Sequence, residues 1–270
     1  MPIATSQAEA GWDDFVGEVQ RQAGIDLRPY KPDQIQRRVR GLMLRSGVEQ
    51  LQDYLRLLVR EPARRHELHR CMTVTVSEFF RSPDQFEHLA GTVLPRLLVR
   101  RRQLRIWSAG CAYGAEPYSI ALLLQGLAPE RRHYILATDI DELALARARA
   151  ADSFTERDVR HVRPPHTDHF GPSPRADGHH ALRPDVRSRV VFRRHNVLSG
   201  PPELDFDLVV CRNVMIYFTP EAKRQLFSNL HQALQPGGYL FVGDSEVMNE
   251  LPEAGFSRQS VGFYRKEVEV

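Results

Sequence analysis

The feature that most constrains the fold is a change of pattern near residue 103, after which short apolar runs alternate with helical stretches. Each apolar run predicts a strand, and helical spacing separates most of them. Strands joined through helices lie parallel in one sheet, so we predict a doubly wound α/β domain. The expected strands are 104–108, 134–138, 190–194, 207–211 and 239–243, the expected helices are 116–127, 142–151 and 220–234, and 256–266 is a terminal hairpin.

The chain before residue 103 has helical spacing instead. We expect a helical domain over residues 1–82, a linker helix over 83–102 and the α/β domain over 103–270, with an insertion at about 163–189 that is rich in proline. One expected helix carries an apolar stripe made of Ile35, Val39, Leu42 and Met43. Its opposite side carries the basic residues Arg37, Arg38 and Arg45.

The linker helix has a recognisable start. Ser82 is the expected cap, Pro83 takes the first helical position, and Gln85 follows three residues after the cap. Pro95 lies inside the same pattern and predicts a kink, because proline lacks the N–H that a helix interior requires.

Composition narrows the functional classes. Hydrophobic residues make up 42% and charged residues 26%, which suits a globular core. The sequence has no apolar run of 18 residues and no secretory signal at its start, so we expect no membrane insertion. Cys71, Cys111 and Cys211 lack metal-binding spacing and are expected to be reduced cytoplasmic thiols, with no metal site. The formal net charge is +3, and the arginine clusters of the first 105 residues favour an acidic partner.

A glycine-bearing turn follows the first predicted strand. Gly110 and Gly114 have no side chain, so a ligand can approach the backbone closely, and Glu116 opens the next helix. The spacing is G-x-x-x-G and not the dinucleotide fingerprint G-x-G-x-x-G, which favours a cofactor without a pyrophosphate. An ordinary strand–helix turn is the alternative interpretation.

Polar residues end two further predicted strands. Asp139 ends the second strand, where a carboxylate can accept both hydroxyls of a ribose, while Asp141 is the expected cap of the next helix. Arg212 and Asn213 end the fourth strand, and Tyr217 lies in the apolar loop that follows. Such positions face the ligand crevice of a parallel sheet.

Hydroxyl residues alternate with apolar ones before the linker helix, at Thr73, Thr75 and Ser77, and Arg81 follows two phenylalanines. A strand or an extended connector fits this pattern. Arg81 can pair with a carboxylate of cofactor or substrate, or it is an exposed arginine between core aromatics.

Together these segments resemble the CheR family of chemotaxis receptor glutamate methyltransferases. The most specific stretch is CRNVMIYF at 211–218, and SEFFRS, GCAYGAEPYSIA, ATDID and PGGYLFVGDSE occur in that family's order. The resemblance covers most of the chain. It implies a helical N-terminal domain followed by a class I methyltransferase domain with a small β-subdomain, and S-adenosylmethionine as the cofactor.

The resemblance also implies roles for individual residues. Asp139 would hold the ribose, Asn196 and Val197 would lie near the adenine, and Arg81 and Tyr217 would lie nearest the transferred methyl group. The remaining cofactor residues would be Thr75, Ser77, Gly110, Glu116, Arg212 and Asn213, and Arg37, Arg38 and Arg45 would face the acidic coiled coil of a receptor. Four positions depart from the family pattern: Thr75, Ser77, Tyr113, where a small hydroxyl residue is usual, and Ala115.

The implied reaction methylates a glutamate side chain of the receptor. Free glutamate has a pKa of about 4.3 and is already ionised near neutral pH, so no general base is required. We expect a cytoplasmic monomer with no nucleic-acid partner. The alternatives are a methyltransferase for a small molecule or nucleic acid, and a non-catalytic scaffold that binds the cofactor.

Overall fold

The computed structural model describes residues 11–72, 77–175, 177–246 and 255–267. Contacts divide the chain into two compact units. The first unit is Met1–Val74 together with Tyr217–Lys223, and the second is Thr75–Ile216 with Arg224–Val270. The segment after the fourth predicted strand therefore belongs by its contacts to the helical unit.

The first unit is helical, as the sequence predicts. Its elements are α2 (Trp12–Glu18), a π-helical turn η1 (Val19–Ala23), α3 (Pro32–Arg45), α4 (Leu51–Arg60) and α5 (Pro62–Met72). The predicted apolar stripe of α3 is confirmed, because all four of its residues are buried. They pack with Phe15, Tyr54 and Leu58 in one hydrophobic core.

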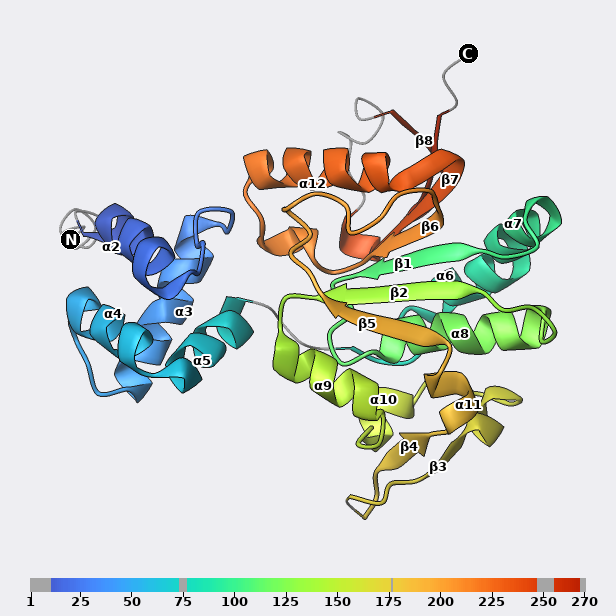
Figure 1. Ribbon diagram of the computed structural model, residues 1–270, viewed down its shortest axis with the longest axis horizontal. Coiled ribbons are helices and arrows are strands. Elements are labelled where there is room, and N and C mark those ends of the chain that lie inside the picture. The colour runs from blue at the N-terminus through green and yellow to red at the C-terminus, as the bar shows by residue number, and fades with distance from the viewer. Residues whose placement is uncertain (1–10, 73–76, 176, 247–254, 268–270) are drawn as a thin grey trace. The chain divides into compact units, whose positions relative to one another are not determined.

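The second unit is built on a seven-stranded sheet in the order β5-β2-β1-β6-β7-β9-β8 (Figure 1). The five strands from β5 to β7 are parallel, and β9 and β8 are antiparallel additions at one edge. The predicted α/β fold is confirmed. The strands are β1 (Arg105–Ala109), β2 (Tyr134–Asp139), β5 (Val190–Arg194), β6 (Phe206–Cys211), β7 (Leu234–Val242), β8 (Phe256–Ser260) and β9 (Phe263–Lys266).

Helices of the second unit precede the first strand or connect the strands. Those before β1 are α6 (Pro83–His88), the π-helical turn η2 (Leu89–Val93) and α7 (Leu94–Arg100). Those between strands include α8 (Ala115–Leu127), α9 (Glu142–Ala150) and α12 (Pro220–Ala233), whose first residues are grouped with the first unit. Short 3-10 turns are η4 (Met215–Tyr217) and η5 (Asp244–Glu246). α8 and α9 contact β2 and β5, and the core around them is apolar.

The expected insertion contains its own small sheet. β3 (Phe170–Pro172) and β4 (His180–Leu182) pair with each other, apart from the large sheet and close to α10 (Glu156–Val159) and α11 (Pro184–Arg187) in Figure 1. The 3-10 turn η3 (His166–His169) leads into β3. The proline-rich segment thus forms a subdomain and not a strand of the main sheet.

The start of the linker helix differs from the prediction in one detail. Ser82 precedes the helix but has a φ of +59° and makes no capping hydrogen bond with its side chain. The helix is interrupted by the π-helical turn at Leu89–Val93, just before Pro95. Because Pro95 cannot donate a backbone hydrogen bond to the preceding turn, that turn widens.

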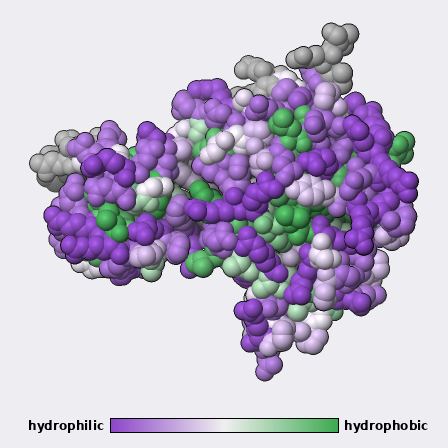
Figure 2. Space-filling model, viewed as in Figure 1, coloured by the Kyte–Doolittle hydropathy of each residue, from purple (hydrophilic) through white to green (hydrophobic). Residues whose placement is uncertain are grey.

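The face of the protein in Figure 2 is hydrophilic over most of its area, and apolar side chains form small separate areas. Large apolar side chains that are exposed include Leu44, Val99 and Val261. Within the described ranges, no helix is long and apolar enough to cross a membrane.

Candidate active site

The order of the strands has a switch point between β1 and β6. From β1 the chain moves outward through β2 to β5, and it then returns to form β6 on the other side of β1. At such a switch point the connections leave in opposite directions, which opens a crevice at the carboxyl ends of the strands. The polar residues that were predicted to end β2 and β6 lie at this edge.

The turn after β1 is shaped by close packing. Gly110 has a φ of +78°, and its N–H donates to the carbonyl oxygen of Thr138 at 2.8 Å. A Cβ atom at Gly110 would lie 2.5 Å from Cγ2 of Val214, which follows β6. The sequence suggested that glycine leaves room for a ligand, and the structure adds a different reason. Gly110 lets the β1 and β6 connections approach each other.

Asp139 lies at the tip of β2 and is fixed by two backbone groups. Its Oδ2 accepts a hydrogen bond from the N–H of Ala112 at 2.8 Å, and its Oδ1 accepts one from Asp141 at 2.9 Å. The side chain is buried, and this burial raises the pKa of Asp139 although the N–H groups lower it. Each oxygen retains a lone pair for a further donor. Asp141 caps α9 as predicted, accepting from Leu143 and Ala144.

Glu116 and Arg212 form an ion pair at this edge of the sheet. Their carboxylate and guanidinium groups are 3.7 Å apart, and Glu116 also accepts from the Ser108 hydroxyl at 2.8 Å. Burial raises the pKa of Glu116, while the positive charges of Arg212 and Arg81 oppose that rise. Arg81 therefore lies within electrostatic reach of this pair.

Arg212 is buried and held on several sides. Its Nη2 donates to the carbonyl oxygen of Arg81 and to Gln85 Oε1, both at 2.9 Å. Its guanidinium lies 4.7 Å from the ring centroid of Phe241. Burial lowers its pKa, and its Nε has no hydrogen-bond partner among the described residues.

Glu246 was not singled out from the sequence, although it ends the motif PGGYLFVGDSE. Its buried carboxylate accepts backbone N–H groups of Asn213, Gly243 and Met215 at 2.5, 3.1 and 2.8 Å. Burial raises its pKa. An acid three residues after a strand-ending glycine is the signal that was available. Glu246 joins the tip of β7 to the loop after β6 and so fixes the backbone of Asn213.

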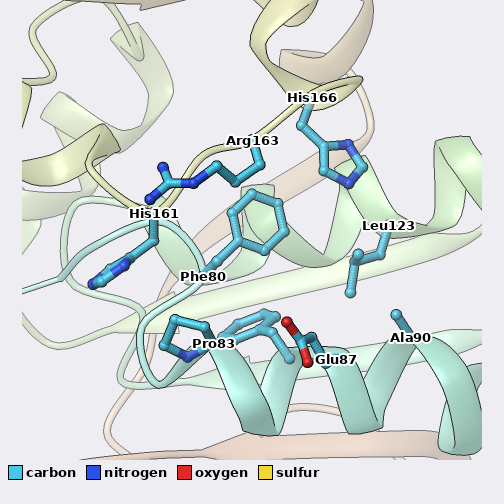
Figure 3. A pocket seen from close by; sticks show the side chains of 9 residues that line it. Phe80, Pro83, Glu87, Ala90, Leu123, His161, Arg163 and His166 are labelled. Atoms are coloured by element: carbon cyan, nitrogen blue, oxygen red, sulfur yellow. The ribbon is translucent and has the colours of Figure 1, made fainter.

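The segment before α6 borders the same edge. Thr75 lies outside the described residues, and Ser77 is buried. Phe80 forms one wall of a hollow of about 280 Å³, which is also lined by residues of α6, α8 and the start of the insertion. Figure 3 shows its ring beside His166, and the two rings stack with centroids 5.2 Å apart.

The residues expected near an adenine follow β5. Asn196 is exposed, and its side-chain oxygen accepts from the N–H of Leu198 at 3.0 Å. Val197 is buried, and its carbonyl oxygen accepts from Asn229 of α12 at 2.8 Å. Both residues are held in a fixed turn, since His195 also donates its N–H to the carbonyl oxygen of Asp139 at 3.0 Å.

The helical unit holds the remaining predicted residues. Arg37 is exposed, and Arg45 pairs with Glu67 at 3.6 Å. Arg38 donates to the carbonyl oxygens of Cys71 and Met72 at 2.6 and 3.0 Å, and it lies 4.9 Å from the ring centroid of Tyr217. Arg38 and Tyr217 are therefore partners inside this unit. No group of three or more potential metal ligands gathers in the parts of the chain that the structure describes.

Comparison with known families agrees with this architecture. The family "CheR methyltransferase, SAM binding domain" matches residues 75–260, and "CheR methyltransferase, all-alpha domain" matches residues 10–73. The two matches meet where the contacts divide the chain near residue 74.

The chain is similar to proteins described as chemotaxis protein methyltransferases and to an uncharacterized protein. A chemotaxis protein methyltransferase of Listeria monocytogenes is 34% identical over 253 residues, which are 93% of this chain and 95% of the relative. Chemotaxis protein methyltransferase 1 of Pseudomonas aeruginosa is 34% identical over 92% of this chain and 94% of its own. An uncharacterized 104.1 kDa protein of Rhodobacter capsulatus is 36% identical, and the match spans 24% of it. The resemblance inferred from the motifs is confirmed, and the chain belongs to the CheR family of S-adenosylmethionine-dependent methyltransferases.

Proposed function

We propose that this protein transfers a methyl group from S-adenosylmethionine to glutamate side chains on the cytoplasmic part of a chemotaxis-type receptor. The observation that carries the proposal is the convergence of Asp139, Glu116 and Arg212 at one sheet edge, in a chain of the CheR family. The reaction yields glutamyl methyl esters and S-adenosylhomocysteine.

The side chains at this edge suit the polar groups of the cofactor. Asp139 has lone pairs left for the two ribose hydroxyls after its two backbone hydrogen bonds. Arg212 is a cation for the amino-acid carboxylate, and Glu116 is an acceptor for the ammonium group. We assign these three roles to the three side chains, with Asn196 and Val197 beside the adenine.

The reaction requires no general acid or base from the protein. When bound, S-adenosylmethionine supplies an electrophilic methyl group on a sulfonium sulfur. The substrate glutamate, with a pKa of about 4.3, arrives ionised. The protein's own task is to orient the groups and exclude water, and Arg81 would orient a carboxylate.

Binding of S-adenosylhomocysteine to the full chain tests the cofactor site by calorimetry. Asp139→Asn should weaken this binding at least about tenfold, because one of two acceptor oxygens becomes a donor. Asp141→Asn is the matched control, because it lies two residues away, is equally buried and keeps a good helix cap. Equal affinity in wild type and Asp139→Asn would remove Asp139 from the ribose site.

Transfer itself is tested with labelled methyl donor and receptor cytoplasmic fragments. The expected product is base-labile label on glutamate. Label on nucleic acid or on a small molecule would identify a different substrate. Tight binding of S-adenosylhomocysteine without any transfer would make the protein a scaffold, which is the second candidate.

Receptor docking is assigned to the exposed side of α3. Arg37 is exposed there, and Arg45 is only partly neutralised by Glu67. Arg38, by contrast, donates hydrogen bonds to backbone carbonyl oxygens. We therefore expect both Arg37→Glu and added salt to weaken receptor binding. Neither should weaken binding of the cofactor to the same extent. Receptor affinity that is insensitive to both Arg37→Glu and ionic strength would exclude this face.

A further inference from the structure

The segment Ser77–Ser82 is attached to the elements that border the cofactor crevice. The N–H of Phe80 donates to the hydroxyl of Ser119 in α8 at 2.9 Å. Farther along, Arg212 at the tip of β6 donates to the carbonyl oxygen of Arg81 at 2.9 Å. The segment therefore runs from the start of α8 to the tip of β6, along the edge where the cofactor is proposed to bind.

The conformation of this segment is not one that the chain adopts freely. Phe80 and Ser82 have φ angles of +53° and +59°, in the left-handed region that favours glycine. Residues held in this region persist only where surrounding contacts impose the conformation. The contacts at the start of the segment therefore matter for its position.

Tyr113 makes those contacts, from the glycine-bearing turn after β1. Its hydroxyl accepts the N–H of Ser77 at 3.1 Å and also lies within hydrogen-bond distance of the Ser77 carbonyl oxygen. The same hydroxyl donates to Oδ1 of Asp158 at 2.8 Å. Asp158 in turn accepts the N–H of Phe79 on its backbone carbonyl at 2.9 Å. Tyr113 and Asp158 thus hold two residues of the segment, Ser77 and Phe79.

The phenol is itself fixed. Arg147 lies 4.0 Å from the centroid of the Tyr113 ring and pairs with Asp158 at 3.2 Å. Burial is the main cause that raises the pKa of Tyr113 to about 12, so its hydroxyl keeps the proton that it donates. The tyrosine side chain spans the distance from the turn to Ser77.

We propose that Tyr113 is a positioning residue, which with Asp158 holds the segment Ser77–Ser82 against the crevice and thereby sets the affinity for the cofactor. The inference rests on the proposed function, because it concerns the same site. Tyr113 acts through the segment and needs no contact with the reacting atoms.

The test compares Tyr113→Phe with Tyr118→Phe in the full chain. Tyr118 is also buried, and its hydroxyl donates to the carbonyl oxygen of Ala148 at 2.8 Å, away from the segment. Each variant loses one buried hydroxyl, so Tyr118→Phe controls for the loss of a buried hydroxyl as such. S-adenosylhomocysteine affinity is measured by calorimetry, and hydrogen exchange is measured at the amides of Ser77 and Phe79.

Tyr113→Phe should raise the dissociation constant about tenfold and speed exchange at both amides, as expected for the loss of one hydrogen bond of ordinary strength. Tyr118→Phe should leave both unchanged. An unchanged dissociation constant in Tyr113→Phe, or an equal increase in both variants, overturns the proposal. A wild-type chain that fails to bind S-adenosylhomocysteine contradicts the proposed function instead. If Tyr113→Phe does not fold, hydrogen exchange of the wild-type chain is compared with and without S-adenosylhomocysteine. The ligand should then slow exchange at the amides of Ser77 and Phe79.

Discussion

Replacing Gly110 with alanine should destabilise the second unit by an amount that the structure lets us divide into parts. A left-handed φ costs an alanine about 1–2 kcal/mol. The new Cβ would lie 2.5 Å from Cγ2 of Val214, and overpacking of that kind costs about 1–3 kcal/mol. The lower entropy of unfolded alanine returns about 0.5–1 kcal/mol. The net loss should be roughly 1–4.5 kcal/mol.

A second substitution isolates the part due to overlap. Val214→Ala removes the overlapping methyl groups, and the nearest remaining side-chain atom of residue 214 is then Cβ at 3.7 Å, an ordinary contact. In this background Gly110→Ala should cost only about 1 kcal/mol, from the backbone conformation. The two substitutions should therefore couple by about 1–3 kcal/mol.

Urea unfolding of the four chains in this double-mutant cycle measures the coupling. A lower midpoint at constant slope would report stability and not a change in compactness. If the costs of Gly110→Ala and Val214→Ala simply add, the two connections do not meet at this point. The reasoning that brings the tip of β1 beside the tip of β6 would then be refuted.

Three further predictions follow from single contacts. Glu246→Gln should cost about 2 kcal/mol in urea unfolding, because its one oxygen cannot accept all three backbone N–H groups, and an unchanged midpoint would contradict this. His133 Nδ1 accepts the N–H of Leu104, and burial lowers the pKa of His133. Its contribution to stability is therefore present above pH 6.5 and is lost as the pH falls. The free energy of unfolding should decrease from pH 7.5 to 5.5, and the decrease should be smaller in His133→Gln. Arg81→Ala should slow methyl transfer to receptor fragments, and an unchanged rate would remove its proposed role.

The parts of this fold that could be predicted are those whose signal is local. Apolar runs gave four of the strands to within a residue, and the helical stripe of α3 proved to be its buried side. β7 begins five residues earlier than Tyr239, because Leu234 already pairs with Phe206 across an irregularity in register. Local apolarity does not encode that pairing.

The contacts within the site could be predicted only in part from local sequence. Asp139 and Arg212 were predictable because polar residues at strand tips meet at one edge of a parallel sheet. Tyr113 and Asp158 are 45 positions apart, and no local pattern indicates that they share a hydrogen bond. Tyr217 was expected in the pocket from its motif, and its ring lies 4.9 Å from the guanidinium of Arg38, which is far away in the sequence. Contacts between distant segments decide these cases.

Strained backbone and buried acceptors occur together around the crevice. Among the described residues there, Phe80, Ser82, Ala112 and Asn213 have a positive φ. A buried side-chain oxygen accepts the N–H of three of them: Ser119 for Phe80, Asp139 for Ala112 and Glu246 for Asn213. The strain of about 1–2 kcal/mol per residue is comparable to the roughly 1.5–3 kcal/mol of a hydrogen bond to a charged group such as Asp139 or Glu246. Side chains from the sheet edge can thus hold backbone conformations that the chain alone would abandon.

Asp139 therefore has two proposed tasks, which a double variant separates. Asp139→Asn weakens the acceptor that holds Ala112 at a φ of +49° as well as the acceptor proposed for the ribose. Ala112→Gly removes the strain, so Asp139→Asn with Ala112→Gly should regain about 1 kcal/mol of stability in urea unfolding. Affinity for S-adenosylhomocysteine should stay low in the double variant. If the affinity returns with the stability, Asp139 acts by holding the turn, and the ribose must find its acceptor elsewhere.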